Sequence, residues 1–117
     1  MTASYLRGGF RFYNRLQRPT EFAAVFASNN KSSDEVFLFL ARKNGTDIAR
    51  LGVTVPKRHI TKAVDRNRAK RIIRESFRLQ KKKLKGMDVV VLVKKEINKN
   101  KSKYADALNR HWEKVTE

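Results

Sequence analysis

Basic side chains spaced at helical intervals are the residues of this sequence best suited to bind a phosphate backbone. Five arginines lie between Arg66 and Arg78. In a helix with about 100° per residue, one face carries Asn67, Lys70, Arg71, Arg74 and Arg78. The opposite face carries Ala69, Ile72, Ile73, Ser76, Phe77 and Gln80. Because guanidinium groups bind phosphate through paired hydrogen bonds, the spacing predicts a helix that binds a polyanion with one face and the protein core with the other.

The charge balance favours the same interpretation. The 117 residues include 28 Lys and Arg against 11 Asp and Glu, giving a formal net charge of +17. Residues 57–85 contain 13 basic side chains and only two acidic ones. A surface that serves solubility alone mixes both signs, and like charges four residues apart destabilise a helix. We therefore favour a nucleic-acid partner over the alternative of a merely solvated charged face.

Residues that could catalyse a reaction without a partner are sparse. Asp34 and Glu35 are the only adjacent acids, and in a strand neighbouring side chains point to opposite faces. His59 and His111 are the only histidines, and the chain has no cysteine. The pair Gly8-Gly9 lacks the spacing of a phosphate-binding loop. We expect no catalytic residue and no metal ligand on this protein.

Composition also limits the class and the location of the protein. The longest apolar runs, residues 36–41 and 89–93, are far shorter than the roughly 18–20 residues that cross a bilayer. The N-terminus lacks the continuous apolar segment of a secretory signal. A hydrophobic fraction of 40% is too high for a disordered basic tail. We expect a cytoplasmic protein with no membrane partner, a flexible basic arm over residues 1–14 and one RNA-binding α/β domain over residues 15–117.

The first half of the chain predicts one helix and two strands. A short helix begins at Pro19, and the polar residues 28–33 indicate a loop. Residues 36–42 form an apolar strand, and residues 48–55 form a second strand of alternating character. Turn-forming residues 44–47 separate the two strands. The pair is therefore expected to form a hairpin.

The second half predicts a long helix, a buried strand and a final helix. The long helix extends from an N-cap at Thr61 to Lys85, before Gly86, which is free to adopt a positive φ. The strand over residues 87–93 is so uniformly apolar that both of its faces must be covered. Ser102 caps the final helix. Its apolar stripe comprises Tyr104, Ala105, Leu108, Trp112 and Val115.

Two segments resemble the signature of the protein subunits of bacterial ribonuclease P. They are residues 51–58, LGVTVPKR, and residues 63–78, AVDRNRAKRIIRESFR. The resemblance extends over about residues 15–115. It implies an α+β fold, a two-layer α/β sandwich in a single domain of order αβββαβα with a left-handed β-α-β crossover. That order contains one strand more than the pattern of the residues predicts.

The resemblance also implies a function. The protein would bind a catalytic RNA and the single-stranded 5′ leader of precursor tRNA, while the RNA subunit and Mg²⁺ carry out the endonucleolytic removal of the leader. No cofactor bound by the protein alone and no small-molecule substrate are expected. The residues expected to bind RNA are Lys57, Arg58, Arg66, Asn67, Arg68, Lys70, Arg71, Arg74 and Arg78. The leader cleft is expected to include Phe22, Phe26 and Leu40.

Several alternatives remain open from the residues themselves. Leu40 stands where some family members have an aromatic residue, and with Phe37 and Phe39 nearby either face of the strand could line the cleft. From the residues alone, the favoured role of Phe22 and Phe26 is to pack a helix onto a sheet. Residues 60–62, ITK, stand where some members have a glycine before the arginine motif. A ribosomal-type structural RNA-binding protein and a DNA-binding protein that uses the long basic helix are the competing functions.

Overall fold

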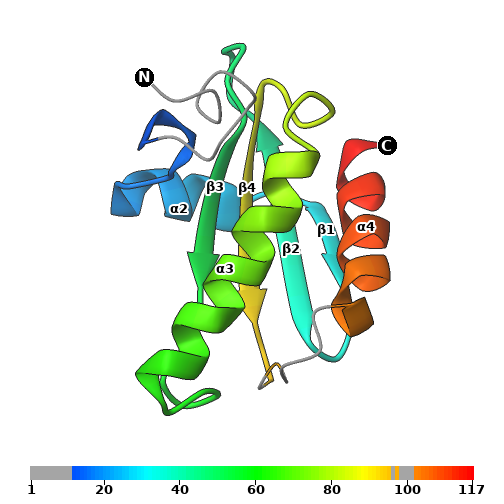
Figure 1. Ribbon diagram of the computed structural model, residues 1–117. Helices are drawn as coiled ribbons and strands as arrows, with labels where there is room; N and C mark the ends of the chain where they lie inside the picture. The colour runs from blue at the N-terminus through cyan, green and yellow to red at the C-terminus, as the bar shows by residue number, and fades with distance from the viewer. Residues whose placement is uncertain (1–11, 96, 98–101) are drawn as a thin grey trace, which may run out of the picture.

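Within residues 12–95, 97 and 102–117, which the computed structural model describes, the main elements follow the order αβββαβα after a short 3-10 helix (Figure 1). Their bounds are η1 Phe12–Asn14, α2 Pro19–Phe26, β1 Asn30–Ser33, β2 Phe37–Lys43, β3 Arg50–Thr54, α3 Ala63–Leu79, β4 Met87–Val93 and α4 Ser102–Thr116. In this part of the chain no helix has the length and apolar content needed to cross a membrane.

The strands form one sheet of order β1-β2-β4-β3, so the expected hairpin between β2 and β3 is wrong. β4 lies between these strands, antiparallel to β2 and parallel to β3. Val89, Val90 and Val91 are all fully buried, and a strand that is apolar on both faces is stabilised most at the centre of a sheet. The turn over residues 44–47 therefore joins two strands that are not neighbours.

The hairpin partner of β2 is β1, which occupies residues expected to form a loop. β1 has the sequence NKSS, whose residues have little intrinsic preference for a strand. Contacts with α4 hold it in place: the Asn30 side chain donates to the carbonyl of Val115 at 2.7 Å, and Ser32 Oγ lies 2.6 Å from Nδ1 of His111. The His111 Nε2–H donates to the Asp34 carboxylate at 2.8 Å. The extra strand implied by the family resemblance is thus present.

The connection between β3 and β4 through α3 is left-handed, as the resemblance implied. In Figure 1 both strands run downward, α3 passes in front of them, and β4 lies to the right of β3. A right-handed connection seen from this side would place the second strand on the left. This arrangement puts the outer face of α3 on the side of the sheet opposite to α2.

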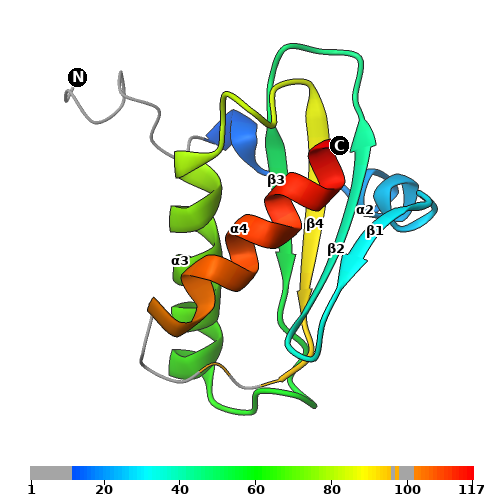
Figure 2. The same cartoon turned by 90° about the vertical axis from the view of Figure 1, so that its right-hand side faces the viewer.

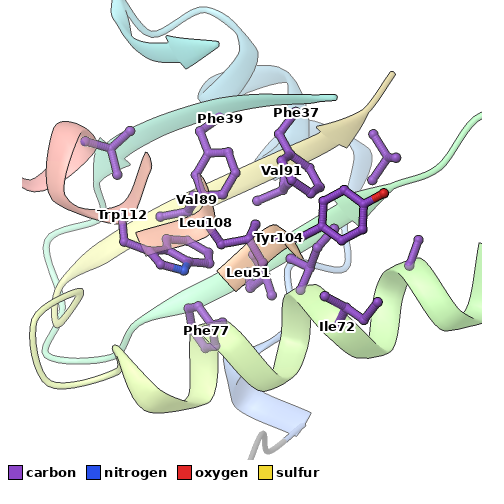
Figure 3. Packing of buried hydrophobic residues seen from close by; sticks show 14 of the residues in the cluster. Phe37, Phe39, Leu51, Ile72, Phe77, Val89, Val91, Tyr104, Leu108 and Trp112 are labelled. Atoms are coloured by element: carbon purple, nitrogen blue, oxygen red, sulfur yellow. The ribbon is translucent and has the colours of Figure 1, made fainter. Parts of the chain in front are cut away.

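Helices cover the two faces of the sheet unequally (Figure 2). The main core lies between the sheet and the helices α3 and α4, and it contains Phe37, Phe39, Phe77 and Trp112, all fully buried (Figure 3). This sheet and helix pair is the expected two-layer sandwich. The short α2 lies across the other face over a smaller apolar cluster of Leu16, Val25, Leu40 and Val90.

Helix α3 is shorter than expected at both ends. It begins at Ala63 with Lys62 as its N-cap and ends at Leu79, so Thr61 is not the cap and residues 80–85 are not regular helix. Leu84 is fully buried in the main core, which requires the chain to turn toward the sheet before β4. Gly86 completes that turn with the expected positive φ, of 78°.

The N-terminal segment is fixed to the sheet from residue 12 onward. The buried Asn14 side chain donates to the carbonyl of Ala49 at 2.7 Å, and the Leu16 amide donates to the carbonyl of Leu51 at 3.0 Å. Of the flexible arm expected over residues 1–14, residues 1–11 lie outside the described residues. Its last three residues form η1, so the folded domain includes them.

Candidate nucleic-acid interface

The outer face of α3 carries a cationic hollow of about 510 Å³. Asn67, Arg71, Arg74 and Arg78 line it at intervals of four, three and four residues, and Arg15 lies across from them. On the opposite face Ala69, Ile72, Ile73 and Phe77 are buried in the main core. The local periodicity thus separates the two faces as the sequence predicts. We call this outer face, with Arg15, the α3 face.

Electrostatic repulsion within the α3 face favours an anionic partner. Burial of the Arg74 guanidinium lowers its pKa, and the positive charge of Arg15 lowers the pKa further. One acid, Glu75, lines the hollow, and its ion pair with Arg78 at 2.6 Å raises the pKa of Arg78. A phosphate between Arg15, Arg71 and Arg74 would relieve the repulsion and supply hydrogen-bond acceptors.

The remaining residues expected to bind RNA lie outside this hollow. Arg66 donates to the carbonyls of Ile60 at 3.1 Å and Thr61 at 2.7 Å, so it fixes the segment that leads into α3. Residues 60–62 contain no glycine, and they connect the turn at residues 57–59 to α3 with Lys62 in an extended conformation. Arg68 pairs with Asp65 at 3.2 Å. Lys57 and Arg58 are exposed in the turn before α3, and Lys70 is half-buried on the helix.

The α2 side of the sheet presents the other predicted site. Leu40, Val90 and Gly52 form a row across three strands beneath α2, and Leu40 is only 2% exposed. The next row contains Leu38, Leu92 and Thr54, and all three are half-buried. Helix α2 therefore covers one row and leaves the next partly open to solvent. We call this open row, together with helix α2, the α2 cleft, after the leader cleft that the resemblance implies.

The structure decides which residues can reach a ligand in the α2 cleft. Phe37 and Phe39 are fully buried in the main core on the other face of the sheet. The face of β2 on the α2 side is therefore the one that carries Leu38 and Leu40. Leu40 contributes to the floor beneath α2, while Leu38 on the same strand face is accessible. On α2, Phe26 is 43% exposed, whereas Phe22 is half-buried against the smaller cluster.

Gly52 sets the position of Phe22. A Cβ atom at residue 52 would lie 2.6 Å from Cζ of Phe22 and 3.3 Å from Cδ1 of Leu16. A methyl group at residue 52 would therefore overlap the Phe22 ring, and it could be accommodated only if the ring were displaced. The absence of a side chain at Gly52 therefore lets the first turn of α2 approach the sheet closely.

An ion-pair network fixes the start of α2 over β3 and β4. Arg50 donates through Nε and Nη2 to the Asp88 carboxylate at 2.8 and 2.7 Å, and through Nη1 to Glu21. Glu21 also accepts the backbone amides of Arg18 at 2.9 Å and Gln17 at 3.1 Å, and these two bonds are the main reason that its pKa is lowered. The network determines where α2, and hence Phe22 and Phe26, stands above the sheet.

The sequence did not identify Arg15 on the α3 face, Arg50 and Gly52, which position α2, or the open row of Leu38, Leu92 and Thr54. Arg15 reaches the α3 face because its segment forms a parallel bridge with Leu51, a pairing across 36 positions that no local pattern reveals. Arg50 and Gly52 take their roles from the register of β3 against β4. Among the residues that the structure describes, no three His, Asp or Glu side chains gather as metal ligands.

Comparison with known proteins gives a consistent result. The family model described as Ribonuclease P matches residues 10–116. The ribonuclease P protein component of Nitrosococcus oceani is 41% identical over 105 residues, which are 89% of this chain and 88% of that protein. The Thermotoga maritima RNase P protein, solved with 1-(4-fluorophenyl)-2-thiourea, is 35% identical, with a TM-score of 0.61 over 87% of this chain and 90% of that one.

A second solved structure supports the fold alone. It is a Staphylococcus aureus RNase P protein mutant with defective mRNA degradation activity, and it is 23% identical to this chain. The TM-score is 0.71, with coverage of 97% of this chain and 94% of that one.

Proposed function

This chain belongs to the ribonuclease P protein family, and we propose that its α3 face binds the RNA subunit of that enzyme while its α2 cleft binds the 5′ leader of precursor tRNA. Membership makes the chain a protein subunit of ribonuclease P, the ribonucleoprotein endonuclease that matures the 5′ end of tRNA. Its partners are therefore the RNA subunit and precursor tRNA. The proposal concerns which residues contact each of them.

The placement of the α3 face and the α2 cleft on opposite sides of the sheet is the observation that carries this proposal. A protein that bridges two RNAs needs two surfaces that can be occupied at the same time. The arginines of the α3 face suit the phosphates of a folded RNA. The partly open apolar row and the exposed Phe26 suit unpaired bases, which bind by stacking without regard to sequence.

We assign the hydrolytic chemistry to the RNA subunit and its Mg²⁺, with the protein contributing affinity. The use of the acidic side chains supports this assignment. Glu21 and Asp88 pair with Arg50, Asp65 pairs with Arg68, and Asp34 binds His111, so these carboxylates stabilise the fold itself.

The test of the α3 face is the binding of purified variants to ribonuclease P RNA over a range of salt concentrations. Arg71→Ala and Arg74→Ala should each weaken binding and reduce the slope of log K against log salt by about one at most, because each loses one phosphate contact. Arg110→Ala removes an exposed arginine from α4 and serves as the matched control. Wild-type affinity and slope in both α3 variants, with circular dichroism unchanged, would refute the assignment.

The test of the α2 cleft compares precursor tRNA with mature tRNA on the reconstituted holoenzyme. Phe26→Leu removes a flat ring that is 43% exposed, so it should leave stability within about 0.5 kcal/mol of wild type. Its affinity for precursor tRNA should fall by about 1–3 kcal/mol, while its affinity for mature tRNA should not change. Val64→Ala removes exposed apolar surface from α3 and is the control. Equal losses on both substrates would remove Phe26 from the leader site.

A further inference from the structure

A second hollow, of about 730 Å³, is lined by residues of η1, the connection between β2 and β3, and the C-terminal end of α3 with the residues that follow it. These segments lie at the same end of the molecule (Figure 1). We call this site the η1 hollow. None of its lining residues except Arg78 belongs to the sites described above. Its volume lies within the range of about 300–1,000 Å³ that is typical of sites for small organic groups.

Exposed apolar side chains concentrate around this hollow. The described residues include five large hydrophobic side chains that are exposed, and three of them line it. These are Tyr13, Ile48 and Leu79, with 48%, 39% and 69% of their surface accessible. Exposed apolar groups that cluster in a concave site indicate a binding surface, whereas single ones on a convex surface need no explanation.

Cations surround the apolar centre of the η1 hollow. Arg78, Lys81, Lys82 and Lys85 line it, and Asp47 is the single acid among its lining residues. An aromatic ring flanked by lysines and arginines is the combination with which proteins hold unpaired nucleotides, because the ring stacks on a base while the cations bind the phosphates. Paired RNA, whose bases are already stacked, would leave the Tyr13 ring without a partner.

Hydrogen bonds fix part of the wall of the η1 hollow, which reduces the ordering needed on binding. Asn14 anchors Tyr13 through its 2.7 Å hydrogen bond to the carbonyl of Ala49. The Asn44 amide donates to the carbonyl of Gly86 at 2.9 Å, which ties the turn after β2 to the turn after α3. The Asn44 side chain also donates to the carbonyl of Ile48 at 2.8 Å and fixes the position of that residue.

We propose that the η1 hollow binds an unpaired nucleotide of the RNA subunit, with its base on Tyr13 and its phosphates on Lys82 and Lys85. The inference rests on the proposed function, because the choice of the RNA subunit over other RNA comes from continuity with the α3 face. Arg78 lines both hollows, so an RNA strand that leaves the α3 face at Arg78 enters the η1 hollow directly.

The first experiment measures the affinity of the full-length protein for ribonuclease P RNA without substrate. Tyr13→Ala should weaken binding by about 5- to 140-fold, the range expected from loss of one stacked base, whereas Tyr13→Phe should bind like wild type. The double variant Lys82→Ala with Lys85→Ala should reduce the salt slope by up to about two. Leu79→Glu changes an exposed side chain and should weaken binding by charge repulsion with the fold intact.

Reference variants separate this inference from the proposal on which it rests. If Arg71→Ala and Arg74→Ala lose affinity while Tyr13→Ala and the lysine double variant do not, the η1 hollow is refuted and the α3 face stands. If all of these variants bind like wild type, both are refuted.

The second experiment identifies the occupant. A photoreactive phenylalanine analogue at Tyr13 should crosslink in the holoenzyme to the RNA subunit, both with precursor tRNA and with mature tRNA. A crosslink only to the leader of precursor tRNA, or only to protein, would overturn the proposal that the RNA subunit fills the hollow.

Discussion

Removal of Arg50 tests how the α2 cleft is built. In an Arg50→Met variant the aliphatic volume is largely kept, but the carboxylates of Asp88 and Glu21 lose their shared cation. The Asp88 side chain is only 6% exposed, and its remaining donor is the Asn44 side chain at 2.8 Å. The substitution therefore leaves a carboxylate that is nearly buried and poorly neutralised.

The magnitude follows from the exposure of the three partners. Loss of one member of a fully buried ion pair costs about 3–5 kcal/mol. Arg50 and Glu21 are 28% and 22% exposed, so solvent screens part of the effect, and we expect about 2–3 kcal/mol. For a chain of 117 residues, about 1 kcal/mol corresponds to roughly 4 °C in Tm. The variant should therefore melt about 8–12 °C below the wild type.

The assay is thermal and urea unfolding of the free protein at pH 7, followed by circular dichroism. Lys114→Met is the matched control, because Lys114 forms an ion pair with Glu117 at 3.9 Å in which both side chains are more than half exposed. That control should lose less than about 0.5 kcal/mol. Adding Asp88→Asn to Arg50→Met removes the unpaired charge and should recover part of the loss. The reasoning would be refuted if the Tm of Arg50→Met fell by less than about 2 °C, or by no more than the Tm of the control.

Two further predictions concern other contacts of the fold. Gly52→Ala places a methyl group against Phe22, so the free energy of unfolding in urea should fall by about 1–3 kcal/mol. The holoenzyme should bind precursor tRNA more weakly and mature tRNA as before. Unchanged stability would mean that the ring can move away freely. Asp34 tests pH dependence. Burial raises the pKa of this carboxyl, but the amide of Phe37, the His111 ring and the amide of Val36 outweigh burial and lower it below its ordinary value of 3.8. A lowered pKa stabilises the folded state above the unfolded value, and that contribution is lost as the pH falls below about 4. Asp34→Asn should be less stable than wild type at pH 7 and lose less stability between pH 5 and pH 3 in urea titrations; parallel curves for the two proteins would contradict the role of Asp34.

The sequence alone determined the features that depend on neighbours along the chain. The separation of Ala69, Ile72, Ile73 and Phe77 from the cations of α3 follows from 3.6 residues per turn, so it needs no tertiary information. The bounds of β4 and the positive φ of Gly86 were likewise predicted, because an unbroken apolar run and an unrestricted residue act locally. The charge balance indicated a nucleic-acid partner, and the long motif over residues 51–78 indicated the family.

Tertiary structure alone decided the features that depend on pairing across long distances. β1 has no apolar pattern, and it becomes a strand because β2, the backbone carbonyl of Val115 and the His111 side chain satisfy its polar groups. The insertion of β4 between β2 and β3 prevented the hairpin expected from the turn at residues 44–47, because burying both faces of β4 stabilises the sheet more than a local hairpin does.

The three candidate binding surfaces were completed in the same way. Arg15 joined the α3 face and Tyr13 entered the η1 hollow because their segment binds the edge of β3. Which face of β2 borders the α2 cleft was fixed by the register of β2 with β4, since a shift of one residue would exchange Leu38 and Leu40 with Phe37 and Phe39. A register of this kind is set by the packing of the whole sheet, and no local stretch of sequence contains it.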